Sequence, residues 1–253
     1  MPKTTPVHPD LHSKLKVKEQ IDFNELAQQQ FSALTAQEFA QAASSYPIVM
    51  LKDGHSGMFV SVALWGIKAG QNLLFNTSNK HWDAVHLPNE MQCQPFSIGP
   101  AVGENNTLTM HINETSELVQ ENEGRVLFDS EGESAFLKSM QAKLADHYQH
   151  QLFTKEFINL MLEKQLLKEI ELMVAFQDGK VKRIKGLYTI DEEALSKLDK
   201  DTILSFFKRN LFIPIYAMLG SLTQFNRLMK LNNQNHELPK IARLQMRAPD
   251  SEQ

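Results

Sequence analysis

The hydrophobic pattern of the chain changes its period near the middle, and this change limits the possible folds more than any other feature. From residue 46 to residue 113, short runs rich in β-branched and aromatic residues are separated by turns at hairpin distances: YPIVMLK, MFVSVALWGI, NLLF, QPFSIGPAV and TLTMHIN. From 134 to 231, apolar residues recur at helical spacing around one hairpin pattern, ELMVAF, QDGK and VKRIKGLYTI. The pattern predicts an α+β fold, with an antiparallel sheet-rich N-terminal half followed by helices and one further β-hairpin.

Local signals place the ends of several helices. Thr35, with Glu38 three residues on, forms a capping box, which predicts a short helix that Pro47 ends. Asp191 or a neighbour caps another short helix, and Pro214 suits the first turn of the last strong one. These signals agree with the helical periodicity of the same regions.

Length and composition favour a single folded domain. Of 253 residues, 42% are hydrophobic and 22% are charged, which is close to ordinary globular usage. We expect residues 1–20 to lie over the surface as an arm, residues 21–231 to form one compact domain, and residues 232–253 to be a polar tail. Within the domain, the β-rich part covers residues 46–113, and the helical part with its hairpin covers residues 134–231.

The charge balance and the lack of targeting signals restrict partners and location. The 26 Lys and Arg residues against 30 Asp and Glu residues leave a net charge of −4, so no global field attracts nucleic acid. The N-terminal residues contain no apolar export segment, and no later stretch approaches the uninterrupted apolar run of a membrane span. The lone Cys93 cannot form an internal disulfide, which suits a reducing compartment. We expect a cytoplasmic protein with no membrane span and no nucleic-acid partner.

One stretch, HWDAVHLPNEMQCQPF at residues 81–96, gathers two His, an Asp and the only Cys. The acceptable metal ligands in it are His81, Asp83, His86 and Cys93. Their spacing matches no strong zinc signature, and the prolines indicate irregular backbone, so we favour a structural role for the stretch. In that interpretation two aromatic residues anchor it in the core and two prolines turn the chain: Trp82, Phe96, Pro88 and Pro95.

Other candidates for chemistry are weaker. His147 and His150 stand three apart on a predicted helix, as a possible ligand pair for which the sequence places no third ligand. The patterns of a nucleophile elbow, a dinucleotide-binding loop and a P-loop do not occur, and Cys93 has no assignable base. The residues therefore indicate no catalytic group and no cofactor, although an active site assembled from distant residues leaves no such trace.

Several separated motifs resemble the SapC-like family of bacterial proteins, in order and with matching gaps. The motifs extend over residues 20 to 231: EFAQAASSYPIVM, a Trp followed by HLPNEMQCQPF, LFDSEGE, VAFQDGKVKRIKGLYTIDEEALSKL and PIYAMLGSLTQFNRL. The 81–96 stretch matches the apolar, proline-bearing pattern of the family at five positions: Trp82, Leu87, Pro88, Pro95 and Phe96. His86 stands where the family usually has Tyr. The other three candidate ligands are not part of the family pattern, so a metal site made from them would be private to this protein.

The resemblance implies function in outline. The family is named for a protein linked to bacterial surface layers, and its members resemble proteins found in gene groups with TonB-dependent receptors and flavin-dependent halogenase-like enzymes. We expect a non-catalytic binding or accessory protein that serves such envelope components, or a neighbouring enzyme, through a protein partner. The expected contact residues are Trp82, His86, Pro88, Pro95 and Phe96.

The alternative hypothesis is a metal-dependent enzyme or enzyme subunit. Its site would lie near His81 and His86, or near His147 and His150. The motivation is the number of His residues, nine in the chain, and their two clusters. The sequence does not predict an oligomeric state.

Overall fold

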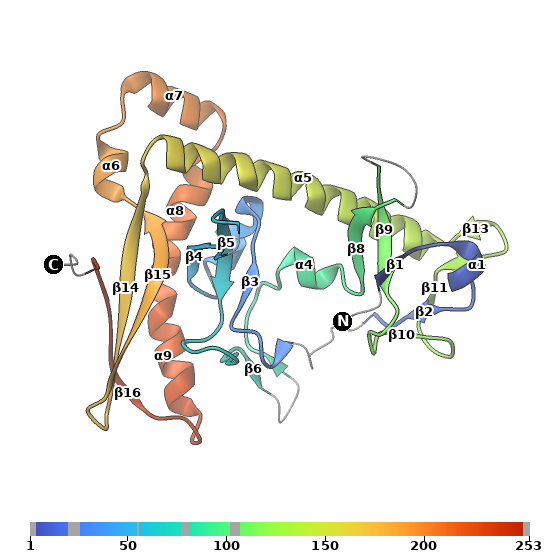
Figure 1. Ribbon diagram of the computed structural model, residues 1–253, viewed down its shortest axis with the longest axis horizontal. Helices are drawn as coiled ribbons and strands as arrows, with labels where there is room; N and C mark the ends of the chain where they lie inside the picture. The colour runs from blue at the N-terminus through green and yellow to red at the C-terminus, as the bar shows by residue number, and fades with distance from the viewer. Residues whose placement is uncertain (1–3, 20–25, 55, 77–80, 102–106, 250–253) are drawn as a thin grey trace. The chain divides into compact units, whose positions relative to one another are not determined.

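The computed structural model describes residues 4–19, 26–54, 56–76, 81–101 and 107–249. These residues form antiparallel sheets and helices, and the predicted α+β class is confirmed (Figure 1). The chain divides into two compact units. Unit 1 is made of residues 1–24 and 89–151, and unit 2 is made of residues 25–88 and 152–253.

This division differs from the single compact domain that the sequence favoured. The chain passes from one unit to the other within the 81–96 stretch, and again within the long helix α5 (Ala135–Glu163). A helix shows one continuous periodicity whether or not it stays in one unit. The sequence pattern therefore gave no signal for the crossing within α5.

Unit 1 holds small antiparallel sheets. One has the strand order β1-β9-β8, another has the order β10-β2-β11, and β12 pairs with β13. The bounds are β1 (Thr4–Pro6), β2 (Lys16–Val17), β8 (Phe96–Pro100), β9 (Leu108–Asn113), β10 (Val119–Gln120), β11 (Arg125–Val126), β12 (Phe128–Asp129) and β13 (Gly132–Glu133), with short helices α1 (Pro9–His12) and α4 (Asn89–Gln92). β8 pairs with β9 as the runs QPFSIGPAV and TLTMHIN predict, and the expected turn GENN at residues 103–106 lies outside the described residues.

The N-terminal residues are part of unit 1 and not the surface arm that we expected. Thr4 to Pro6 pair with β9, and Val17 and His12 are buried. Two isolated buried residues in a polar, proline-containing stretch form no hydrophobic period, so the sequence pattern does not reveal that the stretch is packed. The core of unit 1 consists of Val17, Cys93, Phe96, Met110, Ile112, Leu118, Leu127, Leu137 and Leu144.

Unit 2 is built on an antiparallel sheet with the strand order β16-β14-β15-β4-β5-β3. The bounds are β3 (Phe31–Ala33), β4 (Ile48–Lys52), β5 (Phe59–Leu64), β14 (Leu167–Phe176), β15 (Val181–Ile190) and β16 (Ile241–Arg247). The predicted hairpin is β14 and β15, and its turn contains Gly179 with φ +86°. β15 then pairs with β4, so the late hairpin and the early strands share one sheet.

Two segments of unit 2 depart from the sequence prediction. Residues 241–247, expected in a polar tail, form the edge strand β16 along β14. The alternation of apolar and polar residues in β16 is too weak to predict a strand, because an edge strand exposes much of both faces. The run NLLF does not join the main sheet; Phe75 instead lies in β6 (Phe75–Asn76), which pairs with β7 (His81–Trp82).

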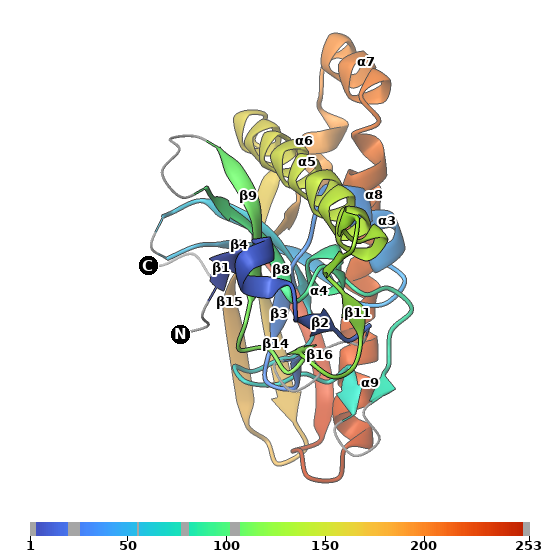
Figure 2. The same cartoon turned by 90° about the vertical axis from the view of Figure 1, so that its right-hand side faces the viewer.

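Unit 2 also contains several helices and helical turns. They are the turn η1 (Ala36–Glu38), α3 (Phe39–Ala42), α6 (Glu192–Ser196), α7 (Lys200–Lys208), α8 (Phe212–Ser221), η2 (Leu222–Gln224) and α9 (Phe225–Gln234). α8 contacts β15, β4 and α3, and α9 contacts β16, so the two run one after the other along the sheet (Figures 1 and 2). The predicted caps are confirmed: Thr35 and Glu38 form a capping box, and Asp191 accepts from the N–H of Glu193 at 3.1 Å. Across the described ranges, no helix has both the length and the apolar character that crossing a bilayer needs.

Candidate functional site

Residues 81–88, here called the 81–88 segment, are fixed to the sheet of unit 2 by an aromatic contact. Trp82 lies in β7 and pairs with Phe75. Its ring meets Trp65 edge to face, with centroids 5.1 Å apart and an interplanar angle of 80°. Trp65 directly follows β5 and is fully buried, so Trp82 docks on a fixed surface.

The backbone of the segment is held by side chains from the end of α3. Ser45 Oγ accepts from the N–H of Val85 at 3.1 Å and from the N–H of His86 at 3.4 Å. The carbonyl of His86 accepts from Tyr46 Oη at 3.2 Å and from Trp82 Nε1 at 3.3 Å. These polar groups are therefore satisfied inside the protein, as buried backbone requires.

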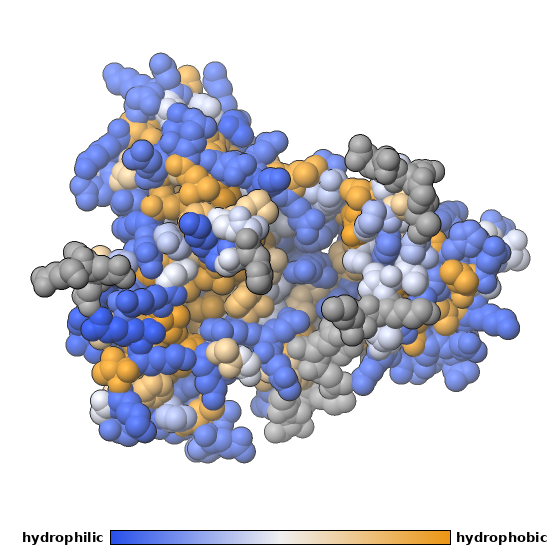
Figure 3. All heavy atoms as spheres, viewed as in Figure 1, coloured by the Kyte–Doolittle hydropathy of each residue, from blue (hydrophilic) through white to orange (hydrophobic). Residues whose placement is uncertain are grey.

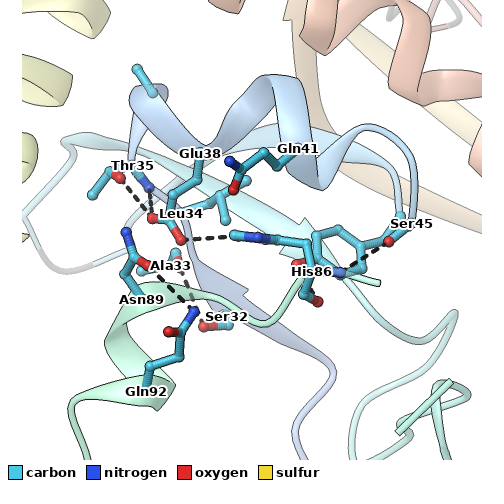
Figure 4. Close-up of polar contacts among 12 residues, drawn as sticks. Ser32, Ala33, Leu34, Thr35, Glu38, Gln41, Ser45, His86, Asn89 and Gln92 are labelled. Carbon is cyan, nitrogen blue, oxygen red and sulfur yellow. Dashed lines mark hydrogen bonds and ion pairs between the residues drawn. The ribbon is translucent and has the colours of Figure 1, made fainter. Parts of the chain in front are cut away.

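The ring of His86 meets a buried carboxylate (Figure 4). His86 Nε2 lies 3.1 Å from Glu38 Oε1, and both side chains are less than a tenth exposed. Glu38 Oε2 accepts from the N–H of Thr35 at 3.1 Å and from its hydroxyl at 2.6 Å. One carboxylate thus closes the turn η1 with one oxygen and holds the 81–88 segment with the other.

Tyr46 stays a hydrogen-bond donor because of its surroundings. Burial, and second the negative charge of Glu38, raise the pKa of its phenol well above the ordinary value. A deprotonated phenol could not donate to the carbonyl of His86. The surroundings of Tyr46 therefore keep its phenol protonated, which the hydrogen bond to the carbonyl of His86 requires.

Arg227 of α9 binds the other side of the segment. Its guanidinium donates to the carbonyl of Ser45 at 2.8 Å, to the carbonyl of Asp83, and to Asp83 Oδ1 at 3.2 Å. The N–H of Asp83 donates to the carbonyl of Leu74 at 2.7 Å. The planar fork of Arg suits this bridging, because it donates in several directions without changing conformation.

Beside the contacts between Arg227 and Asp83, a polar groove runs along α9, and we call it the α9 groove. It has two adjoining cavities of about 610 and 550 Å³ that share Asp83, Leu231 and Gln234. The first is lined by Asn72, Leu73, Leu74, Phe75, Asn76, His81, Asp83, Leu231, Gln234, Asn235, His236 and Glu237. The second adds Asn226, Arg227 and Lys230. Amide and ionisable side chains make up most of the wall, which suits a partner with many polar groups.

The structure brings together only part of the predicted contact set. Trp82 and His86 meet through the carbonyl of His86, and Pro88 is buried at the end of the segment. Pro95 and Phe96 belong to unit 1, where both are buried and Phe96 lies in the core with Cys93. Phe96 is thus a core residue of unit 1, and the contacts of Trp82 are made within unit 2.

The candidate metal ligands do not gather. Cys93 is a buried free thiol in the core of unit 1, while the ring of His86 faces Glu38 in unit 2. Around His147, a contact with Gln151 is formed on the exposed side of α5, at 3.2 Å. Within the part of the chain that the structure describes, no three or more His, Cys, Asp or Glu side chains are placed to hold a metal ion.

Sequence reasoning missed four residues that build the site. Glu38 was recognised only as a cap, and Ser45, Tyr46 and Arg227 were not singled out. The one usable signal was the capping box, because it leaves the second carboxylate oxygen of Glu38 without a stated partner. The others act across 40 to 182 residues of sequence, which no local pattern encodes.

A comparison with protein families decides the relationship of the chain. The family model described as SapC matches residues 7–228, which is most of the sequence. The chain belongs to the SapC family. The match begins within the N-terminal residues that unit 1 incorporates, and it includes every residue of the Glu38–His86–Arg227 network. No curated protein and no solved structure matches this SapC-family chain.

The Trp82 anchor predicts a measurable loss of stability. Trp82→Ala should lower the free energy of unfolding by about 3 kcal/mol, the low end for a large aromatic residue, because the side chain is only partly buried. Trp82→Phe, which keeps a ring but loses the indole N–H, should cost about 1 kcal/mol. Denaturant unfolding followed by circular dichroism measures both, and equal losses would contradict the anchoring role.

The Glu38–His86 contact predicts different costs for two substitutions of one residue. His86→Ala should cost about 3 to 5 kcal/mol, because it leaves a buried carboxylate without its partner. His86→Tyr places a phenolic donor near the same carboxylate and should cost much less, within the 1 to 3 kcal/mol or so of a tight substitution. If urea unfolding gives the two variants the same midpoint, the contact with Glu38 does not matter for stability.

The raised pKa of Tyr46 predicts a loss of stability at alkaline pH. A tyrosine in the unfolded chain ionises near pH 10, while folded Tyr46 keeps its proton above that pH. Its contribution is therefore complete below about pH 10, and above it the free energy of unfolding falls by up to about 1.4 kcal/mol per pH unit. Tyr46→Phe should cost about 1 kcal/mol at neutral pH and reduce this alkaline slope. Unfolding curves at several pH values test it, and an unchanged slope would count against the assignment.

Proposed function

We propose that this SapC-family chain is a non-catalytic binding or accessory protein that takes a protein partner in the α9 groove. The observation that carries the proposal is the fixed wall of that groove. Asp83 forms part of the wall, and it is held by Arg227 on one side and by the carbonyl of Leu74 on the other. A prearranged wall binds at a lower entropic cost than a flexible one.

The chemistry of the groove favours an extended polar segment as the ligand. Asn226 and Gln234 line it, and a side-chain amide offers both a donor and an acceptor, whereas the amide of Asn72 is already bonded to Leu26, Leu74 and Phe75. A peptide backbone presents the matching groups at regular intervals. Charges of both signs are also present, with Lys230 and Glu237 in the lining, so the groove is not tuned to a highly charged polyanion.

The use of His86 supports a structural rather than a catalytic role for the 81–88 segment. Its imidazole bonds Glu38 and is buried, and its backbone bonds Ser45, Tyr46 and Trp82. A general base must reach the proton that it abstracts, and this ring lies against a protein carboxylate instead. The 81–88 segment therefore supports the wall of the α9 groove and does not supply a catalytic group to it.

The resemblance of the sequence suggests the partner, and the lone thiol suggests the location. We propose a cytoplasmic location, because a reducing compartment suits a free thiol such as that of buried Cys93. There the chain would serve envelope components such as a surface layer or TonB-dependent uptake systems, or a neighbouring flavin-dependent halogenase-like enzyme. A cytoplasmic partner would be engaged before export or at the enzyme itself.

Affinity capture from the native host tests the proposal. Lys230→Glu reverses a charge in the groove, and Lys185→Glu makes the same change on β15, outside the groove lining. The unmodified chain and Lys185→Glu should retain one defined protein, and Lys230→Glu should retain it at least about tenfold less, as expected for loss of an ion pair at an interface.

Two results would contradict the proposal. Equal retention by Lys230→Glu and Lys185→Glu would exclude the groove as the binding surface. Recovery of no defined partner, together with turnover of a small molecule by the purified protein, would favour an enzyme.

A further inference from the structure

Helix α7 exposes the side that its sequence pattern would bury. Lys200, Ile203, Leu204 and Phe207 stand at positions i, i+3, i+4 and i+7, so they share one face of the helix. Ile203 is 42% exposed, Leu204 51% and Phe207 71%. The residue that packs inward is Phe206, which is 1% exposed.

The start of α8 continues this apolar surface. Phe206 packs against Phe212 with ring centroids 5.9 Å apart, and Phe212 stacks on Tyr216 at 6.0 Å. Ile213 and Tyr216 are each 58% exposed, on a helix whose sequence contains no charged residue. A helix that is apolar all round is normally buried, so its exposed side indicates a missing partner. In Figure 3 hydrophobic side chains reach the surface beside α7, among hydrophilic ones. We call Ile203, Leu204, Phe207, Ile213 and Tyr216 the α7–α8 face.

Positive charge lies beside this face. Lys200 lies within the exposed stripe of α7, and Lys208 and Arg209 follow Phe207 directly. None of these three cations forms an ion pair with another described residue. Asp199 and Asp201 flank Lys200 at the N-terminal end of α7, where Asp199 caps the helix by accepting from the N–H groups of Asp201 and Thr202, so the excess positive charge lies at the Lys208–Arg209 end. The chain as a whole carries a net charge of −4, so this positive end is a local feature.

We propose that the α7–α8 face docks on the surface of an anionic lipid bilayer. Exposed Phe, Leu and Ile with flanking Lys and Arg are the chemistry of a helix that lies in the headgroup region of such a membrane. The charges also disfavour a second copy of the chain as the occupant. A two-fold dimer through this face would bring two copies of the Lys208–Arg209 pair to one interface.

The proposal is independent of the α9 groove. The face is formed by α7 and the first turns of α8, whereas the residues of α9 that line the groove begin at Asn226, so the two surfaces share no residue. Asn226 lies ten residues after Tyr216 in the run α8-η2-α9, about 15 Å from the rise per residue of a helix. One chain could therefore hold a polar ligand while it sits on a membrane.

Vesicle flotation of the full chain tests the proposal. The protein should float with vesicles of phosphatidylcholine containing phosphatidylglycerol, not with phosphatidylcholine alone, and high salt should release it. Phe207→Asp should weaken partitioning about ten- to a hundredfold, the value of burying one Phe side chain. Lys208→Gln should weaken it about fivefold, the contribution of one cation near an anionic surface.

A matched control separates this face from a general effect of adding charge. Val181→Asp makes the same kind of change at a β15 residue that is 55% exposed, and it should float like the unmodified chain. Phe207 is the most exposed residue of the face, so Phe207→Asp should keep the unfolding midpoint, which thermal unfolding checks.

Three outcomes would overturn the proposal. One is that the folded chain fails to float with anionic vesicles. Another is flotation that Phe207→Asp leaves unchanged. The third is a dimer or a captured protein that Phe207→Asp abolishes, in a chain that does not bind vesicles, since the face would then belong to a protein interface.

Discussion

The contact between Glu38 and His86 is the interaction on which the rest of the site depends. A buried carboxylate is tolerated only when its oxygens are satisfied, and here each oxygen has a different task. Oε2 takes both the N–H and the hydroxyl of Thr35, which fixes η1, and Oε1 takes the ring of His86. Because η1 leads into α3, and Ser45 and Tyr46 follow shortly after the end of α3, the position of the carboxylate also sets the groups that bind the backbone of His86.

The same dependence extends outward to the groove. Arg227 reaches the carbonyl of Ser45 and the side chain of Asp83, so α9 and the 81–88 segment are positioned against one common element. α9 in turn follows α8, whose Ser221 Oγ accepts from the N–H of Ile48 in β4 at 2.9 Å. A change at Glu38 would therefore alter the groove wall through packing, without touching a ligand. The wall is shaped by residues that the ligand does not meet.

Local chemistry in the sequence predicted what is local in the structure. The Thr35–Glu38 capping box, the Asp191 cap and the turn at Gly179 are all present, because each depends on residues within a few positions. The α+β class followed from the change of period. The division into two units did not follow, since the crossing within α5 leaves its periodicity intact. Nor did β16 or the strands of the first twenty residues, whose short polar segments gain their order from long-range pairing.

The candidate site shows the same limit more sharply. The 81–96 stretch drew attention for its metal-type ligands, yet its most constrained group is the carbonyl of His86, which no sequence motif describes. α7 shows the opposite case: its apolar residues at i, i+3, i+4 and i+7 follow the pattern of a buried helix side, yet that side is exposed. Periodicity reports that one side of a helix differs from the other. Neighbouring residues decide which side packs against the protein. In α7, Phe206 packs against the ring of Phe212, and the apolar stripe stays exposed to solvent.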